Sequence, residues 1–497
     1  MAPSLDTSAG SPGYWLAELN RRLDLKYPRL LALEEYDVGN PPLPRGGKNT
    51  AAAFRRFQSM ARTNIVGVAN AAISQTLNPA GFRTGADADA LGDETAYDIW
   101  VTSHMVADSK LLAHSVASLG EGYTLIEPYD NPTGVRINVQ SPFDTITARA
   151  AGDRRKTIAG LRRWKEDDGT WRAVVHLPGR AVHMSGPPSA TAGGPGGWRI
   201  DSDEPTDITR VPIVRYLNRP RLKPVLTFEG RHWTDTLAEV EDSLDIQRRV
   251  NAGVINRLVT SAAQAFRQRF VALGESAYSQ EDLDDILRND PGSVWALTGD
   301  PKFGEFQPSD ILQLLRETQA DIEIFGAVTS TPYQLLPGGT TNVGAETIQA
   351  GRIGLQLKAA DRRVQVGEGN ASTLSIAFEI LGDEERAKEG LIETIWPSLD
   401  DIPISARADA AAKLKDILPH TTIMRDVLGM TPAAIERAKA DAAEDALTRS
   451  IADAANPVQP SGGGGPVGAA AGQPGSTAAV TPQSPSGTAG AAGQPAG

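Results

Sequence analysis

Apolar residues recur at helical spacing in three segments near the N-terminus, residues 12–36, 52–75 and 94–119. An apolar side chain at every third or fourth position predicts an amphipathic helix in each segment. The first helix is predicted to end before DVGNPPLPRGG, because Pro and Gly interrupt a helical pattern. From GYTLIEPYD onward the pattern becomes strand-like.

A hairpin is predicted within this β-rich stretch. The segment LRRWKEDDGTWRAVVHLP places Asp168 and Gly169 between two runs of alternating apolar and polar residues. An Asp-Gly pair in that position favours a tight turn between two strands. Further along, TAGGPGG at 191–197 is predicted to be an exposed loop.

Two long helical patterns flank a short mixed segment in the middle of the chain. The first covers 232–262, and the second covers 309–326 with Ser309 as its expected N-cap. The first apolar stripe consists of Leu237, Val240, Leu244, Val250, Val254 and Leu258. The second consists of Leu312, Leu315, Ile322 and Phe325. The segment between them, 266–306, contains the strand-like runs RFVAL and SVWALTG, so the predicted order is helix, mixed insert, helix.

A further helix is predicted over 345–366, where Gly351 and Gly354 interrupt the pattern. Its apolar residues do not form one clean stripe, so we expect contacts on more than one side. Two interpretations of the glycines remain open, a kink and close packing against a neighbouring helix.

The C-terminal part is predicted to be a set of short helices followed by a disordered tail. Residues 409–451 are rich in Ala, Lys, Asp and Glu, with helix-ending signals at LPHTT and LGMTP. PHTTIMRDVLGMTPAAIERAKADAAEDAL is interpreted as helix, turn, helix. A compact helical cap is favoured over a DNA-reading motif, because the second helix has at least as many carboxylates as cations. The segment after 455 has no charge and no aromatic residue, which predicts disorder.

Composition limits the function classes. The chain has 497 residues, with 61 acidic and 49 basic ones and a formal net charge of -12. Tight binding of nucleic acid over the whole surface is disfavoured, because that binding is driven by Lys and Arg neutralising phosphates. Without cysteine, neither disulfides nor thiolate metal sites are available. No signal peptide and no run of 18 apolar residues is present, so neither secretion nor membrane spanning is expected.

The glycines at 339 and 344 have the spacing of a phosphate-binding loop. That loop requires Lys and then Ser or Thr after its last glycine, whereas here Ala345 and Glu346 follow. A carboxylate at that point would repel a nucleotide phosphate. We therefore reject a nucleotide site and expect no cofactor.

Histidine and carboxylate patterns give no enzyme argument either. The six histidines are dispersed without metal-ligand spacing, so we expect structural or surface roles and no metal site. Asp282, Asp284 and Asp285 are close in sequence, as are Asp400 and Asp401, but adjacency alone does not place two carboxylates on one metal ion. The chain is expected not to be an enzyme.

The order of several local patterns resembles the portal proteins of tailed bacteriophages, in the branch typical of long non-contractile-tailed phages. The similar stretches are LALEEYDVGNPPLP, RTNIVGVANAAISQTLNPAGFRTG, DIWVTSHMVADSKLLAHSVASLGEGYTLIEP, VPIVRYLNRP and STPYQLL. The resemblance covers about residues 15 to 450 and depends on order and spacing. One departure is Gly344-Ala345-Glu346, where relatives often have Ser-Gly-Glu-Ala.

The resemblance implies an α+β, predominantly helical portal fold that assembles as a ring. The implied regions are an N-terminal wing region with helices and a β-rich part (1–230), a first stem helix (231–262), a clip (263–307), a second stem helix (308–328), a tunnel loop (329–344), a long wing helix with the segment after it (345–390), a helical crown (391–454) and the disordered tail (455–497).

The function implied is a channel at the unique capsid vertex of a virion, assembled in the host cytoplasm, that passes duplex DNA with weak contact. The implied partners are further copies of the chain, typically about twelve in a ring, the terminase large subunit, the major capsid and scaffold proteins, and a head-completion or adaptor protein. No membrane partner is implied.

The resemblance also assigns candidate site residues. The tunnel loop would present Pro337, Gly338, Gly339, Thr340, Thr341 and Asn342 to DNA. The loop has no charge, which suits a surface along which DNA slides. Arg248, Arg249 and Arg257 on the first stem helix are candidate channel-lining residues. Two alternatives stay open, another connector or minor capsid protein and a metal-dependent nuclease that uses Asp284 and Asp285.

Overall fold

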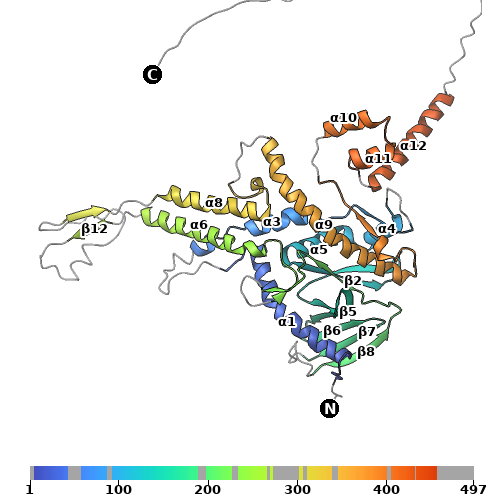
Figure 1. Ribbon diagram of the computed structural model, residues 1–497, viewed down its shortest axis with the longest axis horizontal. Helices are drawn as coiled ribbons and strands as arrows, with labels where there is room; N and C mark the ends of the chain where they lie inside the picture. The colour runs from blue at the N-terminus through green and yellow to red at the C-terminus, as the bar shows by residue number, and fades with distance from the viewer. Residues whose placement is uncertain are drawn as a thin grey trace, which may run out of the picture. The chain divides into compact units, whose positions relative to one another are not determined.

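The computed structural model describes most of the chain before residue 456 (Figure 1). The described ranges are 5–42, 57–86, 92–187, 197–226, 233–265, 269–272, 302–305, 310–338, 345–399, 404–430 and 432–455. They divide into two units, Met1–Ala438 and Lys439–Gly497. In the second unit the structure describes the C-terminal part of one helix.

The first predicted helix is confirmed as α1 (Pro12–Asp37). Ser11 caps it, since its side-chain oxygen accepts a hydrogen bond from the Tyr14 backbone N–H at 3.1 Å, and Pro12 occupies the first turn.

The next two predictions were wrong about continuity. In the segment predicted as one helix over 52–75, residues 61–64 are not helical and a new helix, α3 (Ile65–Ser74), begins there. Asn64 starts it by accepting a hydrogen bond from the Gly67 N–H at 2.8 Å. The segment predicted over 94–119 is α4 (Glu94–Thr102) and α5 (Met105–Leu119). His104 separates them in the left-handed conformation, with φ of 59°.

A five-stranded antiparallel sheet follows, with strand order β4-β5-β6-β7-β8. Its strands are β4 (Thr145–Ala150), β5 (Asp153–Lys165), β6 (Trp171–Leu177), β7 (Arg180–Gly186) and β8 (Arg199–Pro205). The Asp-Gly hairpin is confirmed between β5 and β6, where Gly169 has φ of 84°. α1 packs on one face of the sheet, with Leu16, Leu19 and Leu23 in one core with Leu161 and Val175. The loop predicted at 191–197 lies almost entirely outside the described residues.

A three-stranded antiparallel sheet has the order β3-β2-β9 and forms the centre of the largest core. Its strands are β2 (Glu121–Pro128), β3 (Val135–Gln140) and β9 (Ile213–Leu217). Apolar side chains of α5 pack on it, and so do those of α9 (Ala345–Leu381). At Gly369 an added Cβ would lie 2.4 Å from the Tyr216 ring, so only glycine allows this approach of α9 to β9.

The two glycines singled out in α9 do not interrupt it. The helix is continuous through Gly351 and Gly354. A Cβ at Gly354 would lie 3.5 Å from the Ser330 Cβ, and one at Gly351 would lie 3.6 Å from the Gln334 side chain. These glycines therefore face residues 330–334 and not a neighbouring helix.

The helix, insert, helix order is confirmed, with corrected ends. The first helix is α6 (Leu244–Ala265), preceded by the short η1 (Glu241–Ser243), so it begins at Leu244 and not at 232. The second is α8 (Ile311–Thr329), and its N-cap is Asp310 and not Ser309, because the Asp310 carboxylate accepts a hydrogen bond from the Leu312 N–H at 2.9 Å. The apolar face predicted for α8 is confirmed for two of its four residues. Ile322 and Phe325 are buried, whereas Leu312 and Leu315 are 61% and 39% exposed.

α6 and α8 lie side by side and run antiparallel (Figure 1). Arg249 of α6 donates to Asp321 of α8, and Gly253 of α6 lies against Thr318 of α8. Residue numbers therefore increase along α6 where they decrease along α8, as antiparallel helices require. In the insert between them, β12 (Arg269–Ala272) pairs antiparallel with β13 (Lys302–Glu305), which confirms a strand in RFVAL. SVWALTG lies outside the described residues.

Shorter elements complete the described chain. They are the pair β1 (Gly81–Arg83) and β14 (Glu393–Ile395), the pair β10 (Val225–Leu226) and β11 (Trp233–Thr234), and the turns η2 (Tyr333–Leu335) and η3 (Glu389–Leu391). The C-terminal helices are α10 (Ile404–Leu414), α11 (His420–Thr422), η4 (Ile423–Val427) and α12 (Pro432–Ala455). The prediction of helices there is confirmed, although α12 has 24 residues and is not short. The mixed α+β class is confirmed as well. The predicted tail, 456–497, lies outside the described residues. No helix in the described ranges is long and apolar enough to cross a membrane.

Candidate functional site

An ion-pair network surrounds residues 235–242, the segment between β11 and α6, which we call the acidic strap. It carries four carboxylates, those of Asp235, Glu239, Glu241 and Asp242, and each binds a cation from elsewhere in the fold. The strap was predicted as the start of a helix because Leu237 and Val240 fit an apolar stripe. Both of these residues are buried at the root of α6 instead.

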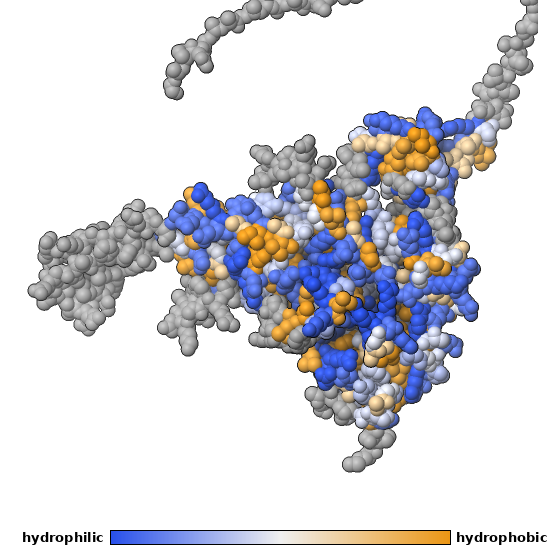
Figure 2. Space-filling view, viewed as in Figure 1, coloured by the Kyte–Doolittle hydropathy of each residue, from blue (hydrophilic) through white to orange (hydrophobic). Residues whose placement is uncertain are grey.

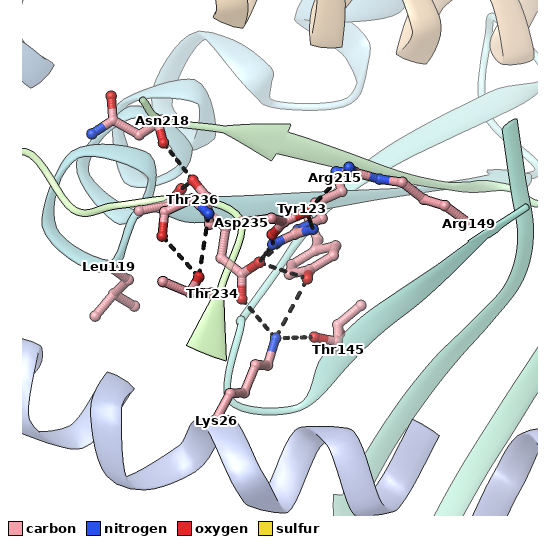
Figure 3. Close-up of polar contacts among 12 residues, drawn as sticks. Lys26, Leu119, Tyr123, Thr145, Arg149, Arg215, Asn218, Thr234, Asp235 and Thr236 are labelled. Carbon is pink, nitrogen blue, oxygen red and sulfur yellow. Dashed lines mark hydrogen bonds and ion pairs between the residues drawn. The ribbon is translucent and has the colours of Figure 1, made fainter. Parts of the chain in front are cut away.

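The first group of contacts surrounds Asp235 (Figure 3). Arg215 of β9 donates to Asp235 Oδ1 at 2.9 Å and, through Nε, to Glu121 Oε2 at 2.6 Å. Lys26, on α1, donates from Nζ to Glu121 Oε1 at 2.7 Å. Arg149 of β4 donates to Asp235 Oδ2 at 3.2 Å. α1, both sheets and the strap thus meet at two carboxylates.

Burial has a strong effect on this group. Burial alone would raise the pKa of Glu121, but Arg215 and Lys26 outweigh it and hold that pKa far below its ordinary value. Burial lowers the pKa of Lys26 to about 8, with Glu121 acting in the opposite direction. Glu121 therefore stays ionised as the centre of the group.

The second pair joins the strap to α1. Arg29 donates from Nε to Glu241 Oε1 at 2.8 Å and from Nη2 to Glu241 Oε2 at 2.5 Å, a bidentate geometry. The same guanidinium donates to the Thr236 carbonyl at 3.2 Å. Both side chains are almost fully buried, at 4% and 2% exposed. Nearby, Arg219 pairs with Asp242 at 2.5 Å and donates to the Glu239 carbonyl at 3.1 Å.

The third group joins the strap to α9. Arg362 donates from Nε to Glu239 Oε2 at 2.8 Å, and Lys358 Nζ lies 2.9 Å from Glu239 Oε1. Asn218 donates to Glu239 Oε2 at 3.1 Å. Burial alone would raise the pKa of Glu239, but Arg362 and Lys358 outweigh it and lower that pKa to about 2. Glu239 is 4% exposed and has cations on two sides.

The network holds the root of α6 in place, and each of the four strap carboxylates is paired with a cation. No group of three or more His, Asp or Glu side chains in the described ranges is arranged to hold a metal ion. Sequence reasoning missed the network. The sequence signal for the network is the four carboxylates within DTLAEVED, because an apolar helical stripe does not account for so many acidic residues.

The segment after α8 contains the predicted loop residues and is anchored for most of its described length. Ser330 turns the chain in the left-handed conformation with φ of 52°, and the Thr331 N–H donates to the Gly326 carbonyl at 2.9 Å. Leu336 is buried against Phe325 and its neighbours. Of the predicted loop residues, Pro337 and Gly338 follow this anchor and are exposed. Gly339, Thr340, Thr341 and Asn342 lie outside the described residues.

The three arginines proposed as channel-lining differ in environment. Arg248 donates to the Tyr36 hydroxyl at 2.6 Å and to Asp245 at 3.0 Å. Arg249 donates to Asp321 of α8 at 2.7 Å, so it joins the two helices. Arg257 is partly exposed.

The remaining titratable candidates are dispersed. His114 pairs with Asp37 at 2.7 Å, and this hydrogen bond raises the pKa of His114. His176 is buried on β6, and burial lowers its pKa to about 4. The acidic residues considered for a nuclease, Asp282, Asp284, Asp285, Asp400 and Asp401, lie outside the described residues, as does His232.

Comparison with known proteins gave one family and several structures. A family model described as phage portal protein, SPP1 Gp6-like, matches residues 24–447. No curated protein matches the chain. Among solved structures, a chain of the virion of a native gene transfer agent particle is 14% identical with a TM-score of 0.42, covering 81% of this chain and 98% of that one. A chain from the neck of the native particle, computed with C12 symmetry, is 14% identical with a TM-score of 0.42, covering 80% and 98%.

Proposed function

The chain belongs to the SPP1 Gp6-like family of phage portal proteins, and we propose that copies of it close into the ring-shaped channel at the unique vertex of a phage capsid. Duplex DNA would pass through this channel inward during packaging and outward during ejection. The family match over residues 24–447 carries the proposal.

The antiparallel pair α6 and α8 is assigned as the stem, and the segment between them, with the pair β12 and β13, as the clip. In support, the two helices are adjacent and antiparallel, and the chain between them contains a strand pair. The described part of 1–230 is assigned to the wing with α9, and the helices from α10 onward to the crown. The tunnel loop is assigned to 337–344, later than the sequence suggests, because 330–336 is anchored to α8.

The proposed contact with DNA is weak. The loop sequence PGGTTNVG has no charge, and the whole chain has a net charge of -12, so attraction of phosphates is limited. Arg249 forms an ion pair with Asp321, which reduces its capacity to bind DNA phosphates if it lines the channel. A surface of replaceable hydrogen bonds lets a duplex slide.

Exposed apolar side chains support assembly with further copies. Along α9, Ile353, Leu357 and Val364 are 53%, 70% and 61% exposed. Their spacing of four and seven residues places them on one helical face. Figure 2 shows orange side chains over the α6–α8 pair and along α9. A ring closes through unlike surfaces on each copy, and a row of this kind provides one of them.

The remaining partners follow from the same assignment. The clip would dock the terminase large subunit during packaging and a head-completion or adaptor protein afterwards, and the wing would contact the major capsid and scaffold proteins. We assign no catalytic role to the chain, because a separate packaging ATPase would supply the work. The location is the virion, after assembly in the host cytoplasm.

The deciding experiment is native mass measurement of the purified full chain together with negative-stain class averages. We expect a closed ring of about twelve subunits with a central hole. A chain that remains monomeric at every concentration, and also with scaffold protein added, would contradict the proposal. Mg²⁺-dependent cleavage of plasmid DNA, lost on joint Asp284→Ala and Asp285→Ala substitution, would favour the nuclease alternative.

A further inference from the structure

One lysine joins the end of α8, the acidic strap and α9. Lys358, on α9, lies with its ammonium 2.9 Å from Glu239 Oε1 of the strap. The same ammonium donates to the Thr329 carbonyl at 2.5 Å, and Thr329 is the last residue of α8. The chain leaves α8 at this point, and the described residues that follow are 330–338.

The geometry at the end of α8 explains why a cation belongs there. The Thr331 N–H bonds the Gly326 carbonyl and the Ser330 N–H bonds the Ala327 carbonyl, which together make a Schellman ending. This motif satisfies the Gly326 and Ala327 carbonyls but not that of Thr329, the residue just before the left-handed Ser330. The carbonyl end of a helix carries partial negative charge, so an ammonium there is favourable.

Burial increases the energetic importance of the two contacts that Lys358 makes. The Lys358 side chain is 11% exposed and that of Glu239 is 2% exposed. Burial lowers the pKa of Lys358, while Glu239 acts in the opposite direction. A buried ammonium requires both of its partners, because removing one leaves charge without compensation.

The lysine also lies close to where the loop begins. A Cβ at Gly354, one helical turn before Lys358, would touch the Ser330 side chain at 3.5 Å, so α9 lies directly against the first residue after α8. Arg362, one turn later, holds the other oxygen of Glu239 at 2.8 Å. Successive turns of α9 therefore contact the loop start and the strap.

We propose that Lys358 is the positioning residue of residues 330–338, the described segment that follows α8, and that it couples this segment to the root of α6 through Glu239. A displacement of the strap reaches this segment because one ammonium binds both the strap and the last carbonyl of α8. That this segment leads into the loop assigned to face DNA rests on the proposed function, whereas the coupling itself does not.

Hydrogen exchange of the full-length protein tests the coupling. Lys358→Met keeps most of the unbranched apolar side chain and removes its charge and its donor, and Glu239→Gln keeps the shape of its partner. We expect each to raise amide exchange in 330–338 by about tenfold, although Glu239 has no described bond to that segment. The matched control is Arg363→Met, which removes a cation of α9 that donates to the Thr76 and Pro397 carbonyls and not to the strap, and it should leave exchange in 330–338 unchanged.

The outcomes separate the coupling from a local cap. Faster exchange in 330–338 with Lys358→Met but not with Glu239→Gln would overturn the coupling, and so would no change with either variant. If Lys358→Met does not fold, as judged by its melting temperature, Glu239→Gln alone decides. Ring formation, followed separately by native mass, reports on the proposed function, so the failure of one inference is distinguishable from the failure of the other.

Discussion

At the residue scale, the buried pair of Arg29 and Glu241 makes the sharpest stability prediction. Arg29→Met leaves the Glu241 carboxylate buried without its bidentate partner, and we expect a loss of about 3–5 kcal/mol in the free energy of unfolding. The double variant with Glu241→Leu removes both charges and should recover most of the loss. Denaturant unfolding of both variants measures the effect. A loss below about 1 kcal/mol for Arg29→Met would mean that water reaches the carboxylate.

The depressed pKa of Glu239 makes a prediction about acid stability. Since its folded pKa is about 2 and its ordinary value is 4.5, its contribution to stability is fully present above pH 4.5 and is lost as the pH falls toward 2. This contribution is about 3 kcal/mol. Melting temperatures from pH 6 down to pH 3 should fall less steeply for Glu239→Gln than for the native chain. Parallel curves would contradict the assignment.

Individual residues also show where sequence reasoning reached and where it stopped. The ends of α1 and the turn at Asp168 and Gly169 were predictable, because each depends on side chains within a few positions. Arg29 and Glu241 are 212 positions apart, and Arg362 and Glu239 are 123 apart. No local pattern reports such pairs, so the sequence shows the carboxylates of the strap but not the cations that bind them.

At the element scale, two glycines of α9 should respond oppositely to alanine. Gly369→Ala places a methyl group 2.4 Å from the Tyr216 ring, and we expect a loss of about 1–3 kcal/mol. At Gly351 the nearest atom is 3.6 Å away, so Gly351→Ala should stabilise the helix by up to about 1 kcal/mol. Thermal unfolding of the two variants side by side checks the sign. Equal effects would show that helix propensity alone governs both positions.

The elements that sequence reasoning predicted best are those with uniform surroundings. α1 and the β5–β6 hairpin have one buried face and clear end signals, and their predictions were confirmed. The helix predicted over the strap was wrong, because ion pairs with distant cations override a helical pattern. The break between α4 and α5 was missed because His104 carries no strong local signal for a left-handed residue.

At the scale of the whole molecule, the exposed row on α9 predicts how assembly is lost. Leu357→Glu places a charge on a side chain that is 70% exposed, and it should leave the single chain folded but weaken the ring. Leu222→Glu is the control, since Leu222 is 88% exposed outside this row and should leave the ring unchanged. Native mass measurement at matched concentrations reports the difference. Intact rings of both variants would place the subunit interface on another surface.

The continuity of α9 has a mechanical consequence. At 1.5 Å per residue its 37 residues form a rod of about 55 Å. Lys358 lies about 20 Å from the start of this helix and about 35 Å from its end. Its ion pair with Glu239 is therefore a pivot point between a shorter and a longer part of the helix. A tilt of about 5° at this pivot point would move the loop end by about 2 Å and the sheet end by about 3 Å in the opposite direction. The C-terminal part of α9 packs in the largest core through Val366, Leu374 and Phe378, so that part of the helix resists such a tilt.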